Sequence, residues 1–210
     1  NMIKMVKTHA PGLRIKVSTV ARVNNVQMAR RYEDMGVEEI IIDENINRNF
    51  TMLDAIRKAV DCELELICNC CCVWPCPAMA DHVISDGHAS QEHLKHSHCY
   101  LQLPHFCCTR DRFSNPVEIV KARWIRPEDV KDYEAMGFRK FKVVERFKNT
   151  RTLLHHVNAY ANRRYDGNLL DLLSLPNRDS YVRPWVEYLN QPEHINVEKG
   201  MRVGGMMNFS

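Results

Sequence analysis

Cysteines are concentrated in one segment of this sequence. Eight of the nine lie between positions 68 and 108, and Cys70, Cys71 and Cys72 are adjacent. Thiolates are soft, strongly donating ligands for zinc and for iron–sulfur clusters, so a convergent set of them is typical of a metal site. The first hypothesis for this segment is therefore a metal centre.

Disulfides and simple packing account for the cysteines less well. A disulfide framework suits small secreted domains, whereas this chain has 210 residues, an odd number of cysteines and no expected signal peptide. Packing as small buried hydrophobic residues suits Cys62 and Cys68, which lie in or beside an apolar strand. Packing does not account for three adjacent cysteines followed by Trp-Pro-Cys-Pro at 74–77, so the metal hypothesis is kept.

Apolar patterns before the cysteines alternate between strand and helix. Strands separated by helices of this length pair in parallel through crossover connections, which predicts a βαβαβ unit. Its predicted elements are a strand at 14–20, a helix from an Asn24 cap to a Gly36 C-cap, a strand at 37–43, a helix opening at 49–51 and a strand at 62–69.

The alternation stops after position 70 and resumes after position 121. The intervening residues hold six of the ten histidines and few periodic apolar residues, which predicts a metal-binding insert at 70–121 within one domain spanning 1–210. The later predicted elements are a helix from Pro127 to Gly137, a strand at 138–144 and a helix capped by Thr150 that runs to about 164.

Functional groups in parallel α/β folds gather at the carboxyl ends of the strands. Three polar segments follow predicted strands here, at 43–48, 69–76 and 145–146. Lys142 and Arg146 would share one face of an extended strand, within a basic stretch, and are our candidates for binding an anionic substrate. A solvated basic surface is the alternative interpretation of that stretch.

Five ordered motifs between about residues 15 and 173 resemble the collagenase-like peptidase family U thirty-two (U32). They are Asn45-x-Asn47-Arg48-Asn49-Phe50, Asn69-x-x-Cys72-x-x-x-Cys76-Pro77-x-x-x-x-His82, Trp124-Ile125-Arg126-Pro127-Glu128-Asp129, Phe141-Lys142-Val143-x-x-Arg146 and Tyr165-Asp166-Gly167-Asn168. The resemblance implies a TIM-like (β/α) barrel that carries a four-cysteine [4Fe–4S] cluster. It further implies oxygen-independent hydroxylation, as in RNA modification and ubiquinone biosynthesis, with prephenate as the linked oxygen source.

Matching these motifs assigns the cluster ligands to Cys72, Cys76, Cys99 and Cys108, with Cys108 preferred narrowly over Cys107. Zinc remains the alternative metal. Family members begin with further βα units that are absent before residue 14, so we expect a partial barrel, which is either a fragment or is completed by a second chain.

The candidate substrate-binding residues are Arg126, Glu128, Lys142 and Arg146. For Arg126 and Glu128 the alternative is that they cap a helix and pair with neighbours. The leading hypothesis is an iron–sulfur hydroxylase-like protein acting on RNA or on a small aromatic or prenylated substrate. The alternatives are a peptidase and a non-enzymatic zinc-binding interaction module. With no apolar run long enough for a membrane span, we expect a soluble cytoplasmic protein.

Overall fold

The structure is a computed structural model that describes residues 2–82, 84, 107–112, 114–144 and 149–173. The chain divides into two compact units. The first comprises residues 1–75 and 118–174, and the second comprises residues 76–117 and 175–210. Much of the predicted insert at 70–121 lies outside the described residues, so its role as a metal-binding domain stays a prediction.

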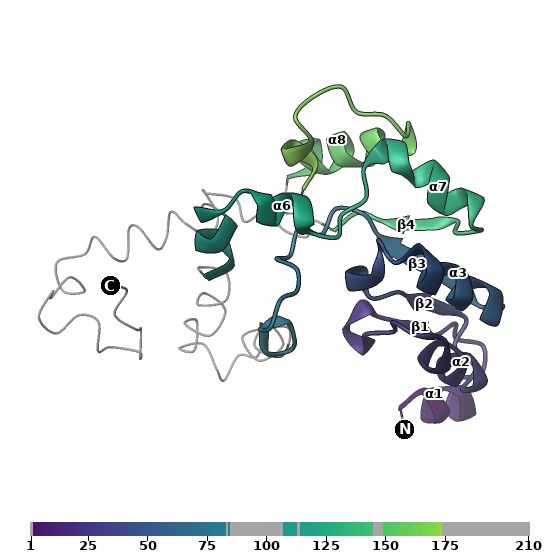
Figure 1. Ribbon diagram of the computed structural model, residues 1–210. Helices are drawn as coiled ribbons and strands as arrows, with labels where there is room; N and C mark the ends of the chain where they lie inside the picture. Colours follow the sequence, from purple (N-terminus) through teal and green to yellow (C-terminus); the bar gives the residue numbers. More distant parts are fainter. Residues whose placement is uncertain (1, 83, 85–106, 113, 145–148, 174–210) are drawn as a thin grey trace, which may run out of the picture. The chain divides into compact units, whose positions relative to one another are not determined.

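A four-stranded parallel sheet forms the centre of the first unit (Figure 1). Its strands are β1 (Lys16–Val17), β2 (Glu39–Ile41), β3 (Glu63–Ile67) and β4 (Lys140–Lys142), and they lie side by side in that order. Residue Ile40 pairs with Leu64, and Leu66 pairs with Phe141. The predicted parallel α/β sheet is therefore confirmed, while four strands alone do not establish a partial TIM-like barrel.

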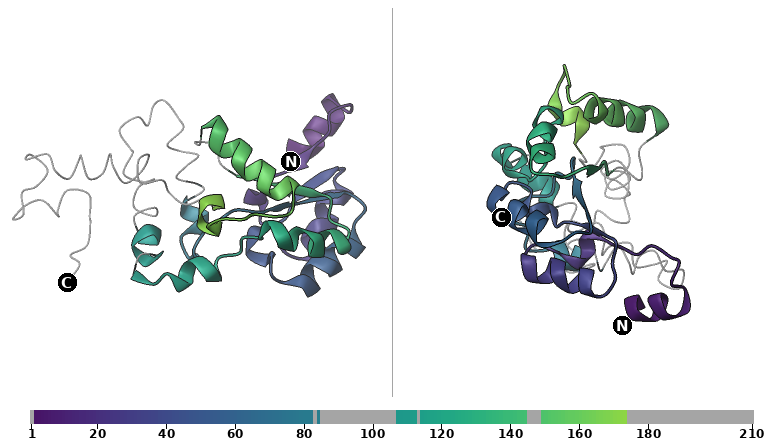
Figure 2. Two further views of the ribbon diagram at one scale, coloured as in Figure 1. Left: turned by 90° about the horizontal axis from the view of Figure 1, so that it is seen from above. Right: turned by 90° about the vertical axis from the view of Figure 1, so that its right-hand side faces the viewer.

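Helices α2, α3 and α7 lie on one face of this sheet (Figures 1 and 2). The helices are α1 (Met2–His9), α2 (Val26–Asp34), α3 (Phe50–Ala59), α6 (Val117–Lys121), α7 (Val130–Ala135) and α8 (Thr150–Ala161). Short 3₁₀ helices occur at Thr19–Ala21 (η1), Glu44–Ile46 (η2), Pro127–Asp129 (η4) and Leu169–Leu172 (η5).

Two predicted helix starts are wrong by one residue. The N-cap of α2 is Asn25 rather than Asn24, because the Asn25 carboxamide oxygen accepts a hydrogen bond from the Met28 N–H at 2.9 Å. The N-cap of α8 is Asn149, and the predicted cap, Thr150, is the first helical residue. An N-cap needs extended backbone angles and a side chain that reaches the third helical N–H, and in each pair only one residue has both.

The predicted strands are shorter in the structure, and the helix predicted from Pro127 opens at that residue with a 3₁₀ turn. The strand expected at 14–20 ends at Val17, because Ser18 caps the 3₁₀ helix η1. The helix predicted from Pro127 begins with the 3₁₀ helix η4 before α7. The glycine stops are confirmed: Gly36 and Gly137 have φ angles of +85° and +95°, a left-handed conformation that glycine adopts without strain.

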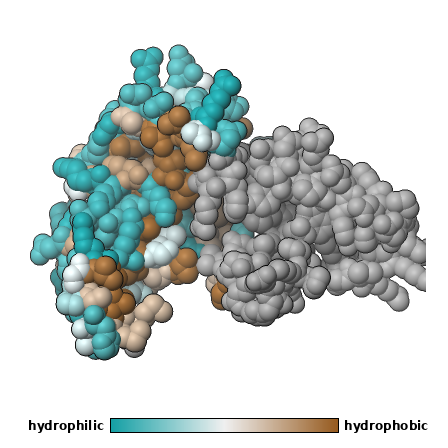
Figure 3. Space-filling view, turned by 180° about the vertical axis from the view of Figure 1, so that it is seen from behind, coloured by the Kyte–Doolittle hydropathy of each residue, from teal (hydrophilic) through white to brown (hydrophobic). Residues whose placement is uncertain are grey.

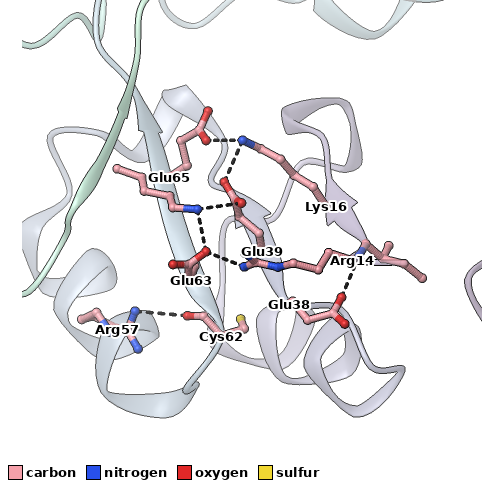
Figure 4. A network of polar contacts seen from close by, with 10 residues as sticks. Arg14, Lys16, Glu38, Glu39, Arg57, Cys62, Glu63 and Glu65 are labelled. Carbon is pink, nitrogen blue, oxygen red and sulfur yellow. Dashed lines mark hydrogen bonds and ion pairs between the residues drawn. The ribbon is translucent and has the colours of Figure 1, made fainter. Parts of the chain in front are cut away.

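The two faces of the sheet differ in character. On the helix-covered face, alternate strand residues such as Ile40, Leu64 and Leu66 are almost completely buried beside Phe138. Full burial of one such side chain stabilises the fold by about 1.5–3 kcal/mol. The other face carries ionised residues, among them Lys16, which pairs with glutamates on β2 and β3 (Figure 4).

Seen from behind, the described residues present a mainly hydrophilic surface with a hydrophobic band across it (Figure 3). None of the helices within the described ranges has the length and apolar character needed to cross a bilayer.

Candidate functional site at the carboxyl edge of the sheet

Polar side chains converge where β1 and β2 end. The 3₁₀ helix η1 follows β1 and positions Thr19 and Arg22, and Arg22 adopts a left-handed backbone conformation with φ of 54°. After β2, Asp43 caps the 3₁₀ helix η2 by accepting a hydrogen bond from the Asn45 N–H at 3.0 Å. This cap turns the chain so that Glu44 faces η1.

These four side chains form a hydrogen-bonded group, here called the Thr19–Glu44 cluster (Thr19, Arg22, Asp43 and Glu44). The Thr19 hydroxyl donates to Glu44 Oε2 at 2.6 Å. The Arg22 guanidinium donates to Asp43 Oδ1 at 3.1 Å and lies 3.5 Å from Glu44 Oε1. Both carboxylates are buried, with 3% of Asp43 and 8% of Glu44 exposed. Two carboxylates against one guanidinium leave the cluster with one net negative charge.

Two cysteines lie in contact just after β3. The Cys70 thiol donates to Cys72 Sγ at 3.5 Å. This hydrogen bond, together with burial and the neighbouring charge of Glu44, raises the pKa of Cys70 well above its ordinary value. The cysteine pair follows β3 and the Thr19–Glu44 cluster follows β1 and β2, so both lie at the carboxyl edge of the parallel sheet. A neutral Cys70 is a poor nucleophile, so the structure does not favour it as an attacking group.

Buried asparagines fix the loops around this edge. Asn69 donates from Nδ2 to the backbone oxygens of Val144 and Leu172, each at 3.1 Å, and its Oδ1 accepts from the Val144 N–H at 2.8 Å. Asn47 donates to the carbonyl oxygen of Ile67 at 2.8 Å. The sequence patterns did not predict this bracing role, although both asparagines belong to the U32-like motifs and each follows a strand.

The predicted cluster ligands are only partly covered by the described residues. Cys72 lies in the first unit, Cys76 and Cys108 lie in the second, and Cys99 is outside the described residues. Cys108 Sγ accepts a hydrogen bond from Arg112 Nη1 at 3.4 Å. Within the described ranges, the eight cysteines form no disulfide, and no group of three or more potential ligands could hold a metal ion.

The donor set can be tested for fit on the cysteine pair alone. Thiolates bound tetrahedrally to one zinc ion at about 2.3 Å lie about 3.8 Å apart. The Cys70–Cys72 contact of 3.5 Å is close to that spacing, and it includes Cys70, which motif matching did not select. The described residues therefore supply two thiols that fit a soft metal, and the four-cysteine ligand set stays a prediction.

The remaining predicted site residues have the following surroundings. Arg126 forms a bidentate ion pair with Asp129 at 2.8 and 2.6 Å, and Glu128 accepts a hydrogen bond from the Tyr165 N–H at 2.7 Å. Lys142 ends β4 next to Ile67, and Arg146 lies outside the described residues. The Arg126 partner is three residues away, whereas the Glu128 partner is 37 residues away along the chain. A substrate role for these four residues stays a prediction.

The predicted inert cysteines behave as packing residues. Cys68 is completely buried in the hydrophobic core, and burial raises its pKa to about 12. Burial and the charge of Glu33 raise the pKa of Cys62 to about 11. Both thiols are therefore neutral near pH 7, as packing residues should be.

Comparisons with known proteins place these features in a family. Residues 1–74 match peptidase family U32. The uncharacterized protease MJ1657 of Methanocaldococcus jannaschii is 32% identical over 165 residues, which cover 79% of this chain and 48% of that protein. The solved structure of the U32 peptidase Mk0906 shares 25% identity over 38% of this chain and 31% of that chain, with a TM-score of 0.34. The chain thus spans about half the length of its curated relative. As its motifs predict, the chain belongs to peptidase family U32.

Proposed function

We propose that this chain is part of a peptide-hydrolysing enzyme whose reacting groups lie in the Thr19–Glu44 cluster. The observation that carries the proposal is the hydrogen bond of 2.6 Å from the Thr19 hydroxyl to the buried carboxylate of Glu44. The name of the curated relative, a protease, supports hydrolysis. It gives no support to the hydroxylase hypothesis, so the peptidase alternative is the better supported of the two.

The proposed roles follow from this geometry. Thr19 Oγ1 attacks the carbonyl carbon of a peptide bond while its proton passes to Glu44 Oε2, which later returns it to the leaving amine. The Arg22 guanidinium, which contacts Glu44, donates hydrogen bonds to the negative oxygen that forms on the attacked carbonyl. Water then hydrolyses the ester on Thr19 and regenerates the hydroxyl.

Glu44→Gln and Thr19→Val test these roles on a gelatin or casein substrate. Removal of a general base typically lowers the rate by 10²–10⁴-fold, and each variant should lose activity by about that factor. Thr8→Val is the matched control, because the Thr8 hydroxyl is exposed and donates only to the Lys4 carbonyl oxygen. Wild-type rates in both Thr19→Val and Glu44→Gln would remove the cluster from the mechanism.

The cysteine pair favours a second candidate function, a thiolate-bound metal centre. We propose Cys72, Cys76, Cys99 and Cys108 as [4Fe–4S] ligands, with zinc as the alternative metal. The contact between Cys70 and Cys72 supports thiol convergence. The associated activity is oxygen-independent hydroxylation of RNA or of a small aromatic or prenylated substrate.

Metal analysis of anaerobically purified protein separates the two metals. Brown protein containing iron supports the cluster, and colourless protein with one zinc ion supports a zinc-binding module. Cys72→Ser and Cys76→Ser should both lose the metal, because too few thiolates would remain. Unchanged metal content in both variants would contradict the assignment. In the hydroxylase candidate, Lys142 and Arg146 are the residues proposed to bind an anionic substrate. Arg126 and Glu128 are further candidate substrate-binding residues.

We also propose that the sheet is one part of a TIM-like barrel, with residues 70–121 as its metal-binding insert. Support comes from the parallel order of the strands and from helices α2, α3 and α7, which lie on one face only. Further βα units, in the same polypeptide or in a second chain, would pair with β1 and β4. The mass of the 210-residue chain in solution tests the second-chain version, which a monomer at high concentration would contradict.

A further inference from the structure

Two arginines and two tryptophans form a second group of contacts in the first unit. Arg48 follows η2, Trp74 follows β3, and Arg123 and Trp124 connect α6 to η4. We call Arg48, Trp74, Arg123 and Trp124 the Arg–Trp cluster. Neither proposed function uses it.

Each guanidinium in this cluster lies by an aromatic ring. The Cζ atom of Arg123 is 3.6 Å from the centre of the Trp74 ring, a stacked arrangement. The Cζ atom of Arg48 is 6.0 Å from the centre of the Trp124 ring, at the outer limit of a cation–π contact. Stacking uses the flat face of a guanidinium and leaves the N–H groups at its edge available for hydrogen bonds.

The backbone around these side chains is held in place by hydrogen bonds. Arg48 donates to the carbonyl oxygens of Val120 and Trp124 at 2.8 and 3.5 Å. Asn47, the residue before Arg48, donates to the carbonyl oxygen of Arg123 at 2.9 Å. These hydrogen bonds join the chain segments that carry Arg48 and Arg123. Both segments are therefore held in place before a ligand binds.

The cluster has positive charge that no carboxylate within the described residues neutralises. Arg22, Arg126 and Arg163 each pair with a carboxylate, whereas the side-chain partners of Arg48 and Arg123 are carbonyl oxygens and rings. The Nε–H of Arg123 is buried and has no hydrogen-bond partner among the residues that the structure describes. Burial lowers the pKa of Arg123 most, and the charge of Arg48 lowers it further, as expected for two cations in one cluster.

We propose that the Arg–Trp cluster binds a phosphate dianion, either free or as a phosphate ester. Two uncompensated guanidinium groups match two negative charges, and a guanidinium fork donates paired hydrogen bonds to phosphate oxygens. Binding would relieve the repulsion between Arg48 and Arg123. A single carboxylate would leave one of the positive charges unbalanced.

The test is calorimetric titration of the full 210-residue chain with inorganic phosphate and with phosphoserine, at constant ionic strength. Arg48→Gln and Arg123→Gln should each weaken phosphate binding about tenfold or more, because each removes charge-assisted hydrogen bonds. Arg48→Lys should show a smaller loss, since it keeps the charge without the fork. Arg139→Gln is the matched control, because Arg139 also donates only to backbone carbonyls, of Glu134 and Phe138, and it should bind as wild type.

The two ligands distinguish the source of the dianion. Binding of inorganic phosphate alone indicates the free ion, and tighter binding of phosphoserine indicates an ester. If circular dichroism shows that Arg123→Gln does not fold, the test uses Arg48→Gln and Arg48→Lys. The proposal is overturned if wild type binds neither ligand, if Arg48→Gln binds as wild type, or if acetate binds as tightly as phosphate.

Discussion

Glu39 lies at the centre of the ion-pair network on the open face of the sheet, and Glu39→Gln perturbs it with little change in shape. Its two carboxylate oxygens contact Lys16 Nζ at 2.7 Å and Lys140 Nζ at 2.9 Å. Lys16 also pairs with Glu65 on β3 (Figure 4). Only 12% of the Glu39 side chain is exposed, so the substitution removes a charge that both lysines need.

The expected cost follows from the pKa of Glu39. Burial raises this pKa, but the hydrogen bonds from Lys16 and Lys140 outweigh burial and lower it from 4.5 to about 2. At about 1.4 kcal/mol per unit, the shift corresponds to an upper limit of about 3 kcal/mol. Because the two lysine side chains are 42% and 36% exposed, solvent screening reduces the expected loss in Glu39→Gln to about 1–2 kcal/mol.

The lowered pKa of Glu39 also predicts how the stability loss in Glu39→Gln varies with pH. A carboxyl group whose pKa is lower in the folded state stabilises the fold fully above its unfolded pKa, and that stability is lost as pH falls through the folded pKa. The difference in unfolding free energy between wild type and Glu39→Gln should therefore be greatest near neutral pH. It should shrink as pH falls from 4.5 towards 2.

Urea unfolding followed by circular dichroism measures this difference across the pH range. Glu63→Gln is the matched control, because Glu63 also pairs with Lys140 but its side chain is 47% exposed. That variant should lose clearly less stability than Glu39→Gln, because solvent screens an exposed ion pair. A Glu39→Gln loss that is equal at all pH values, or no larger than that of Glu63→Gln, would refute the reasoning.

Three further predictions concern other parts of the first unit. Asn69→Ala should lower the unfolding free energy by about 2–4 kcal/mol, since it leaves the Val144 N–H and two carbonyls without their partner. A loss below about 1 kcal/mol in urea unfolding would contradict the bracing role. Asn149→Ala should lower the unfolding free energy by about 0.5–2 kcal/mol through loss of the α8 cap, and Thr150→Ala should lower it clearly less. Equal losses of the two variants in thermal melts would contradict Asn149 as the cap. Cys62, with a pKa of about 11, should be alkylated slowly by iodoacetamide near pH 8, and fast labelling mapped to Cys62 by mass spectrometry would contradict burial.

The elements of the fold could be predicted from the sequence because their signals are local. Apolar residues at helical spacing identify α3, and the glycines at 36 and 137 end α2 and α7. Cap positions were less certain, because Asn24 and Asn25 are adjacent and equally suitable in composition. Only the backbone angles of the folded chain decide between them.

The groups of the candidate site could not be predicted in the same way. Thr19 and Glu44 are 25 positions apart, and Asn69 binds residues 75 and 103 positions away. No spacing rule connects such pairs, because the sheet register and the turns after each strand bring them together. The sequence did predict the edge where they meet, since 43–48 and 69–76 both follow strands.

The sheet face opposite helices α2, α3 and α7 carries charged residues first and apolar residues further along its strands. The apolar residues lie next to the candidate site. Strands of parallel sheets that are covered on both faces usually read as continuous hydrophobic runs. Here Glu39 and Glu65 instead alternate with core residues and pair with lysines. Two residues further along the same face stand Ile41 and Ile67, each 3% exposed.

The carboxylates of the Thr19–Glu44 cluster come immediately after this apolar level. The apolar side chains of Ile41 and Ile67 exclude water. This strengthens the interaction of Arg22 with Asp43 and Glu44, because charges attract more strongly in a medium of low dielectric constant. Replacing Ile41 with Thr should therefore weaken that interaction without touching any of its members. If Ile41→Thr lowers the rate of peptide hydrolysis while Thr19 and Glu44 are kept, the apolar residues beside the cluster contribute to its activity. An unchanged rate in Ile41→Thr would show that the cluster acts independently of them.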